Sequence, residues 1–179
     1  MAQNAEAEHS ILDPDVMFDA LEKRIVDCAL GFDTGRIRAA YETAKMAHSG
    51  QLRKDGSPYV THCVAAAEIC VDMGLEEDSV IAALLHDVAE DTGWTFQDLA
   101  ERGIPEPVLE ALRLLTHREG VPYMEYVAAL KGNRIAAAVK LADLRHNSDL
   151  TRLEQVDEET LARLEKYWAA MELLKLESL

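Results

Sequence analysis

The chain has 179 residues, with 18 Lys and Arg against 33 Asp and Glu, and therefore a formal net charge of −15. A chain of this length forms one domain that folds without disulfides or a structural metal, and its hydrophobic fraction of 49% excludes a disordered chain. The negative charge disfavours a nucleic acid polymer as partner, which requires a basic face, but it allows a small nucleotide where a few basic residues converge.

The N-terminal residues do not resemble an export signal. Residues 1–10 are polar and acidic, without the basic and apolar regions of a signal peptide, and no stretch of 18 uninterrupted apolar residues follows them. Cys28, Cys63 and Cys70 form no CxxC pair and are typical of buried thiols in a reducing compartment. We therefore expect a cytoplasmic protein that does not bind a membrane.

Apolar residues recur three and four positions apart along most of the chain, which predicts helices. Residues 1–12 are expected to form a flexible segment, and residues 13–179 a single domain that ends in an amphipathic helix. A short strand of two or three residues is compatible with the turn around Asp55 and Gly56. The pattern predicts an all-α bundle. The helical segments cover about residues 16–30, 35–48, 60–73, 76–91, 95–102, 105–115, 122–131, 133–146 and 157–177.

Four ionisable residues stand together at the end of the most apolar predicted helix, namely His86, Asp87, Glu90 and Asp91. A buried charge without a partner costs several kcal/mol, so such groups need a counter-ion or a metal. The alternative is a helix end whose acids are simply solvated, although acids at a C-terminus oppose the helix dipole. The segment therefore favours a metal or catalytic site.

Further ligands must come from distant segments. His62 lies at the start of a predicted helix, and Asp143 lies in an apolar helix with Asn147 one turn beyond it. Taken singly, His62 is more often a satisfied core histidine, and Asp143 could pair with Lys140 or Arg145. Two imidazoles and two carboxylates would suit a borderline-hard ion such as Mn²⁺, with Zn²⁺, Fe²⁺ or Mg²⁺ as less suited alternatives.

Three ordered segments resemble the hydrolase half of the RelA/SpoT family, within the HD superfamily of phosphohydrolases. They are residues 47–62 (AHSGQLRKDGSPYVTH), 82–92 (AALLHDVAEDT) and 140–147 (KLADLRHN). The resemblance covers roughly residues 41–150. Within the family, the chain is similar to the small alarmone hydrolases that lack a synthetase domain. It implies an HD-domain helical bundle and a metal-dependent removal of the 3′-pyrophosphate from guanosine tetra- or pentaphosphate.

The resemblance also implies roles for single residues. Mn²⁺ would be held by His62, His86, Asp87 and Asp143. Water activation and proton transfer would fall to Glu90 and Asp91. The nucleotide would be contacted by Arg53, Lys54 and Asn147, although the first two alone would be interpreted as a solvated turn. These assignments agree with the chemistry, because a metal acidifies water and a nearby carboxylate can accept its proton.

The chain departs from the family pattern after Asp143. Arg145 stands one position later than the basic residue usual in the family, which turns it to another helical face, and it is retained as a candidate substrate contact. The acid Asp149 replaces a basic residue, so the contacts to phosphate differ from the usual ones. His117 and Tyr123 are compatible with either pocket or loop surface.

Two other functions remain consistent with the residues. One is an HD-type phosphatase that acts on another nucleotide, such as a nucleoside monophosphate or NADPH. The other is a non-catalytic helical module that binds a nucleotide, although such a module has no need for a crowded acidic metal site. The sequence is compatible with a monomer or a homodimer.

Overall fold

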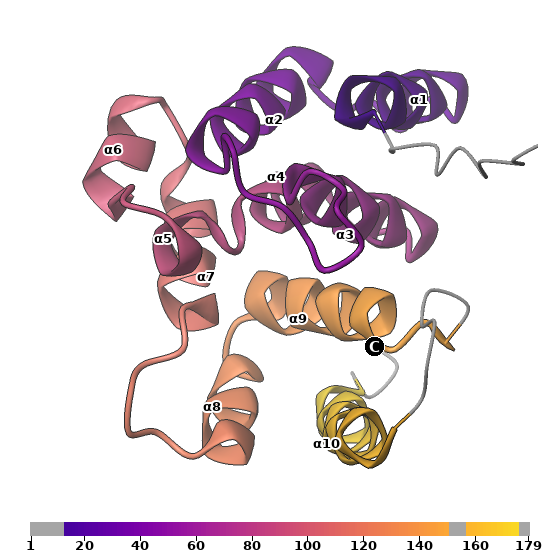
Figure 1. Cartoon of the computed structure of the whole chain (residues 1–179). Helices are drawn as coiled ribbons and strands as arrows, with labels where there is room; N and C mark the ends of the chain where they lie inside the picture. Colours follow the sequence, from indigo (N-terminus) through magenta and orange to yellow (C-terminus); the bar gives the residue numbers. More distant parts are fainter. Residues whose placement is uncertain (1–12, 151–156, 176–179) are drawn as a thin grey trace, which may run out of the picture.

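The computed structural model describes residues 13–150 and 157–175, which are helical nearly throughout (Figure 1). The expected flexible segment 1–12 and the last residues of the predicted final helix lie outside the described residues. The helices are α1 (Pro14–Asp27), α2 (Thr34–Ala47), α3 (Val60–Asp72), α4 (Glu77–Leu85), α5 (Val88–Asp91), α6 (Phe96–Glu101), α7 (Glu106–Leu115), α8 (Tyr123–Leu130), α9 (Arg134–Asn147) and α10 (Glu158–Leu174). The predicted all-α class is confirmed.

Capping residues explain why several helices begin where the sequence predicts. The side chains of Asp13, Asp33, Asn133 and Asp157 each accept a hydrogen bond from a backbone N–H in the first turn of the following helix. At the other end of α3, Gly74 has a φ of 68°, a conformation that glycine adopts without steric cost. The observed ends agree with the predicted ones to within a few residues.

The predicted helix over residues 76–91 is wrong in one respect, because it is two helices. α4 ends at Leu85, and α5 begins at Val88. Between them, Asp87 has φ −97° and ψ −4°, which departs from α-helical geometry. At this point the ring of His86 also contacts the Ala83 carbonyl oxygen through Nδ1 at 2.8 Å.

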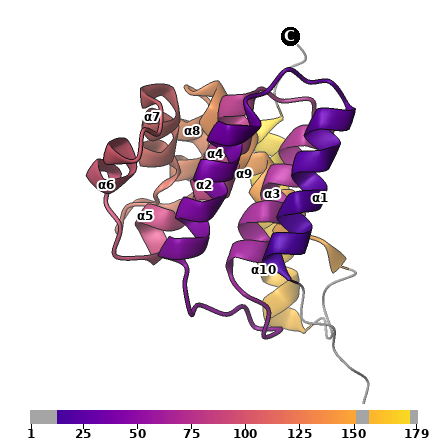
Figure 2. The same ribbon diagram turned by 90° about the horizontal axis from the view of Figure 1, so that it is seen from above.

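α4 forms the centre of the bundle, because every side chain from Ser79 to Leu85 is buried. It packs against α2, α3, α7 and α9 (Figures 1 and 2). Helices α3, α4 and α9 therefore meet in the interior. His62 lies on α3, Asp143 lies on α9, and His86 directly follows α4. Within the described residues, none of the helices combines the length and apolar character that crossing a bilayer demands.

The link between α2 and α3 contains the expected short extended pairing, an isolated antiparallel bridge between Leu52 and Pro58. Gly56, at the tip of this turn, has a φ of 80°. The cysteine prediction holds for Cys63 and Cys70, which are buried, and is wrong for Cys28, which is exposed just after α1.

Candidate active site

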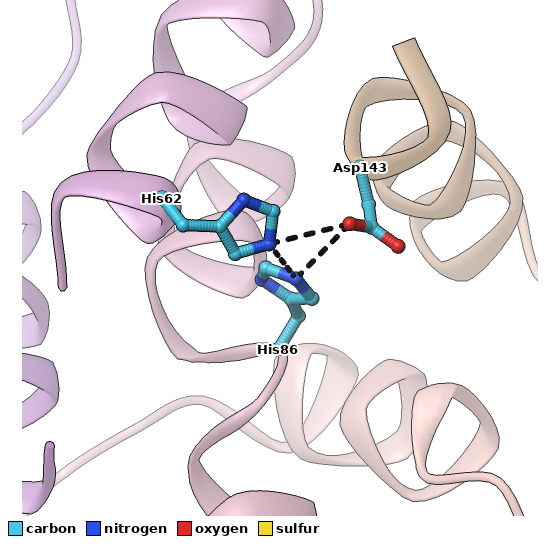
Figure 3. Close-up of side chains that lie close together, drawn as sticks. All are labelled: His62, His86 and Asp143. Atoms are coloured by element: carbon cyan, nitrogen blue, oxygen red, sulfur yellow. Dashed lines mark hydrogen bonds and ion pairs between the residues drawn. The ribbon is translucent and has the colours of Figure 1, made fainter. Parts of the chain in front are cut away.

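Two imidazoles and a carboxylate converge where α3, α4 and α9 meet (Figure 3). His62 comes from the first turn of α3, His86 from the end of α4 and Asp143 from α9. The two Nε2 atoms are 3.2 Å apart. Oδ1 of Asp143 lies 3.3 Å from Nε2 of His62 and 3.7 Å from Nε2 of His86. All three side chains are buried.

Asp87 completes the group, so the structure brings together all four predicted metal ligands. Its Oδ2 lies 3.1 Å from Nε2 of His86 and 3.5 Å from Nε2 of His62. Donor atoms around a cation with bonds of about 2.1 Å lie roughly 3.0 to 3.4 Å apart. Separations of 3.1, 3.2 and 3.3 Å fall within this range, and the other two are 3.5 and 3.7 Å. The mixed nitrogen and oxygen donors suit a divalent transition metal.

The pKa shifts within this group also favour a cation site. Burial lowers the pKa of His86, but the carboxylates of Asp87 and Asp143 outweigh it, so the pKa stands well above its ordinary value. Burial raises the pKa of Asp87, and the neighbouring histidines overcome this and hold it far below the usual range. The pocket thus stabilises positive charge among its carboxylates, as a cation site requires.

A second layer of contacts orients the four side chains. Lys140 donates to Oδ2 of Asp143 at 2.9 Å, and the amide of Asn147 donates to its Oδ1 at 2.5 Å. Nδ1 of His62 lies 2.6 Å from Nδ1 of His146, also on α9. Each imidazole therefore points Nε2 at the cluster and uses Nδ1 for an outer partner, the arrangement typical of histidine ligands.

The acidic pair Glu90 and Asp91 lies just beyond this cluster. The hydroxyl of Tyr59 is 2.8 Å from Oδ2 of Asp87 and 2.8 Å from Oδ2 of Asp91, so it links the two carboxylates. The Glu90 carboxylate has another partner, since it accepts a hydrogen bond from the backbone N–H of His117 at 2.9 Å. Both acids are exposed.

A cavity of about 520 Å³ opens onto the cluster. His62, Asp87 and Asp143 contribute to its lining. Of the residues predicted to contact a nucleotide, the cavity is lined by Arg53, Lys54 and Asn147. Arg145 is exposed and does not line the cavity, because it projects about 100° around α9 from its lining neighbours.

Several lining residues were not predicted from the sequence. Tyr59, Lys140 and His146 lie within the segments that resemble the family. Their position beside the predicted site residues could have indicated that they line the cavity. The residues from α10 had no such signal, because an amphipathic helix does not reveal which of its polar residues border a cavity. These lining residues are Arg163, Lys166 and Tyr167. Of the two residues left open between pocket and loop surface, Tyr123 of α8 lines the cavity and His117 does not.

Comparisons with known proteins show what this chain is similar to. Residues 40–113 match the family described as HD domain. Over 141 residues the chain is 35% identical to the bifunctional (p)ppGpp synthase/hydrolase SpoT of Escherichia coli K12. This match covers 73% of this chain and 20% of that protein. It is 38% identical over 114 residues to the guanosine-3′,5′-bis(diphosphate) 3′-pyrophosphohydrolase of Haemophilus influenzae, covering 58% of this chain and 17% of that protein. The chain spans about a fifth of the length of the curated relatives it matches.

A solved structure has a similar fold. It belongs to a metazoan ortholog of SpoT, described as hydrolysing ppGpp and playing a role in starvation responses. The TM-score is 0.65 at 24% sequence identity, and the match covers 80% of this chain and 88% of that one. This likeness shows that the helical arrangement is shared.

Proposed function

We propose that the chain is a metal-dependent phosphohydrolase of the RelA/SpoT type, since residues 40–113 match the HD domain family and the chain is 35% identical to a SpoT protein over 141 residues. Its substrates are guanosine 3′,5′-bis(diphosphate) and the corresponding pentaphosphate, from which it removes the 3′-pyrophosphate. The observation that carries the proposal is the meeting of two imidazoles and two carboxylates, with each carboxylate 3.1 to 3.7 Å from both imidazoles, beside a cavity that contains basic residues.

The metal ligands in this proposal are His62, His86, Asp87 and Asp143, and the ion is Mn²⁺. Mixed imidazole and carboxylate ligation suits a borderline-hard cation. When bound, such a cation supplies Lewis acidity to the phosphoryl oxygens and to the attacking water. Lys140 and Asn147 keep the Asp143 carboxylate in place through the hydrogen bonds described above.

The reaction needs proton transfer at two atoms. Water adds to the phosphorus bonded to O3′, the P–O3′ bond breaks, and O3′ receives a proton as pyrophosphate leaves. We assign proton transfer to Glu90 and Asp91, one helical turn beyond the ligands. Asp91 suits the acceptance of the proton from water, because the Tyr59 hydroxyl holds its carboxylate beside that of Asp87.

The charge of the substrate requires local compensation. Arg53 and Lys54 reach the cavity from the turn between α2 and α3, although the chain as a whole is strongly negative. A guanidinium can contact a phosphate with two parallel hydrogen bonds, which favours Arg53 as an anchor for the scissile diphosphate. Asn147 adds a neutral polar contact to the nucleotide on the α9 side.

The test is to incubate the purified protein with Mn²⁺ and guanosine 3′,5′-bis(diphosphate) and to resolve the products by ion-exchange chromatography. We expect guanosine diphosphate and pyrophosphate in equal amounts. Release of orthophosphate alone would replace the proposal by a phosphatase acting on another nucleotide. Tight nucleotide binding without turnover would replace it by a binding module.

A pair of variants tests the metal assignment. Asp87→Asn removes one carboxylate from the cluster, so we expect loss of bound metal by elemental analysis and loss of turnover. Asp27→Asn makes the same chemical change at an exposed position at the end of α1 and should leave both unchanged. Equal metal content in the two variants would contradict the ligand set.

A further inference from the structure

His48 is a buried histidine that the proposed chemistry does not use. It directly follows α2 and is 3% exposed. Its Nδ1 lies 2.7 Å from Oε1 of Gln51, and its ring stacks on that of Tyr59 with centroids 4.7 Å apart. In the part of the chain that the structure describes, Nε2 of His48 has no hydrogen-bond partner. The polar contact with Gln51 and the stacking on Tyr59 therefore both fix this ring.

The side-chain amide of Gln51 connects His48 to α5. Its Nε2 donates to the backbone carbonyl oxygen of Asp91 at 2.8 Å. A carbonyl oxygen can only accept, so the NH2 of Gln51 faces Asp91 and Oε1 faces His48. Oε1 also can only accept, so the imidazole carries a proton on Nδ1. Burial lowers the pKa of His48 below 6.5, so the ring is neutral at pH 7 and this is its single proton. The two hydrogen bonds therefore run in one direction, from His48 through Gln51 to Asp91.

Both contacts of His48 lead to Asp91, the last residue of α5. Gln51 holds the carbonyl oxygen of Asp91. The stacked ring of Tyr59 carries the hydroxyl that lies 2.8 Å from the Asp91 carboxylate. α5 has four residues, and a helix this short is not stable by its own hydrogen bonds. Contacts from outside the helix must therefore keep the Asp91 carboxylate in place.

We propose that His48 and Gln51 are positioning residues, which act on the reaction by holding Asp91 in place. This inference rests on the proposed function, in which Asp91 accepts a proton from the attacking water. A displacement of about 1 Å at a reacting group can cost about 100-fold in rate. Neither His48 nor Gln51 is among the residues that line the cavity. Their loss should therefore lower kcat and leave KM unchanged.

The first experiment compares Gln51→Met with Gln97→Met. Methionine is unbranched, like glutamine, but has no strong donor or acceptor, so Gln51→Met interrupts the connection to Asp91. Gln97 is an exposed residue of α6 that donates to Glu101, so Gln97→Met makes the same change elsewhere. With guanosine 3′,5′-bis(diphosphate), we expect Gln51→Met to lower kcat about tenfold with KM and metal content unchanged. Gln97→Met should change none of the three. An unchanged kcat in Gln51→Met, or a loss of its bound metal, would overturn the inference.

Two further variants test the route of the effect. His48→Phe keeps a ring that can stack on Tyr59 but removes the Nδ1 donor, so we expect it to lower kcat as well. A kcat equal to that of the unaltered protein would overturn the role of His48. Gln51→Met is then repeated in the Asp91→Asn background, where it should change kcat by less than about twofold. The full tenfold loss in that background would show that Gln51 does not act through Asp91.

A measurement without turnover separates this inference from the proposed function. Hydrogen exchange of backbone amides is followed by mass spectrometry in the unaltered protein and in Gln51→Met. The backbone N–H of Asp91 donates to the Asp87 carbonyl, so residues 88–92 should exchange faster in Gln51→Met while α4 is unchanged. If exchange is faster but the unaltered protein does not hydrolyse the nucleotide, the support of Asp91 stands and the proposed function fails. If hydrolysis proceeds and exchange is the same in both proteins, the inference is overturned.

Discussion

Replacing His146 with alanine is expected to weaken divalent-metal binding although His146 is not a ligand. Its Nδ1 lies 2.6 Å from Nδ1 of His62, and the two rings stack with centroids 4.8 Å apart. For Nε2 of His62 to bind a cation, the proton of that ring must sit on Nδ1. Nδ1 of His146 then accepts that proton in a hydrogen bond, which fixes both the tautomer and the orientation of His62.

The size of the effect follows from the burial of this contact. His62 is 3% exposed, so water cannot replace the lost acceptor without rearrangement. Loss of such an outer partner typically weakens metal affinity by about 10- to 100-fold, which corresponds to about 1.4 to 2.8 kcal/mol. An unsatisfied buried donor costs about 1 to 3 kcal/mol, so two independent arguments give the same range.

The assay is a competition titration of Mn²⁺ against a chelating dye, with His146→Ala and His146→Asn measured side by side. The asparagine oxygen can still accept a hydrogen bond, so His146→Asn should recover part of the affinity that His146→Ala loses. Unfolding curves of both variants without metal show whether the fold is intact. An affinity for His146→Ala equal to that of the unaltered protein would refute the tautomer argument, as would equal losses in the two variants.

Three further outcomes are expected. Asp91→Asn should lower kcat about 100-fold or more while elemental analysis finds the usual metal content, because Asp91 lies beyond the ligand cluster. Leu84→Ala should lower the free energy of unfolding in urea by about 2 to 5 kcal/mol, because this side chain is fully buried in α4. Hydrogen bonds from Thr95 lower the pKa of Asp98 below 3.8, so this carboxylate stabilises the fold above that pH. The stability deficit of Asp98→Asn in urea should therefore be present at pH 7 and shrink as the pH falls below 3.8.

Local chemistry explains why most helices could be predicted from the sequence. The caps at Asp13 and Asp33 and the stop at Gly74 act within a few residues of themselves, so their effect is visible in the chain. The division of the predicted helix over residues 76–91 into α4 and α5 could not be predicted from neighbouring residues in the chain. It depends on contacts of His86 and Asp87 with side chains from α3 and α9, which exist after the bundle has formed.

The candidate site shows the same limit. His86 and Asp87 stand out because charged groups follow a run of core residues. His62 and Asp143 do not stand out by spacing, since a core histidine or a paired aspartate gives the same pattern, and the resemblance to a family was needed to select them. Lys166 escaped prediction because the pattern of α10 fixes which face is apolar, without indicating which polar residues border a cavity.

The break between α4 and α5 also explains how adjacent residues serve one site. On a continuous helix, neighbouring side chains point about 100° apart, so His86 and Asp87 would diverge. With the backbone of Asp87 displaced from helical geometry, its Oδ2 reaches 3.1 Å from Nε2 of His86. The backbone N–H of Asp91 nevertheless donates to the Asp87 carbonyl at 2.8 Å, so helical spacing resumes at once. The same break therefore gathers two ligands and keeps Asp91 one turn away, where a carboxylate can exchange protons without joining the ligand cluster.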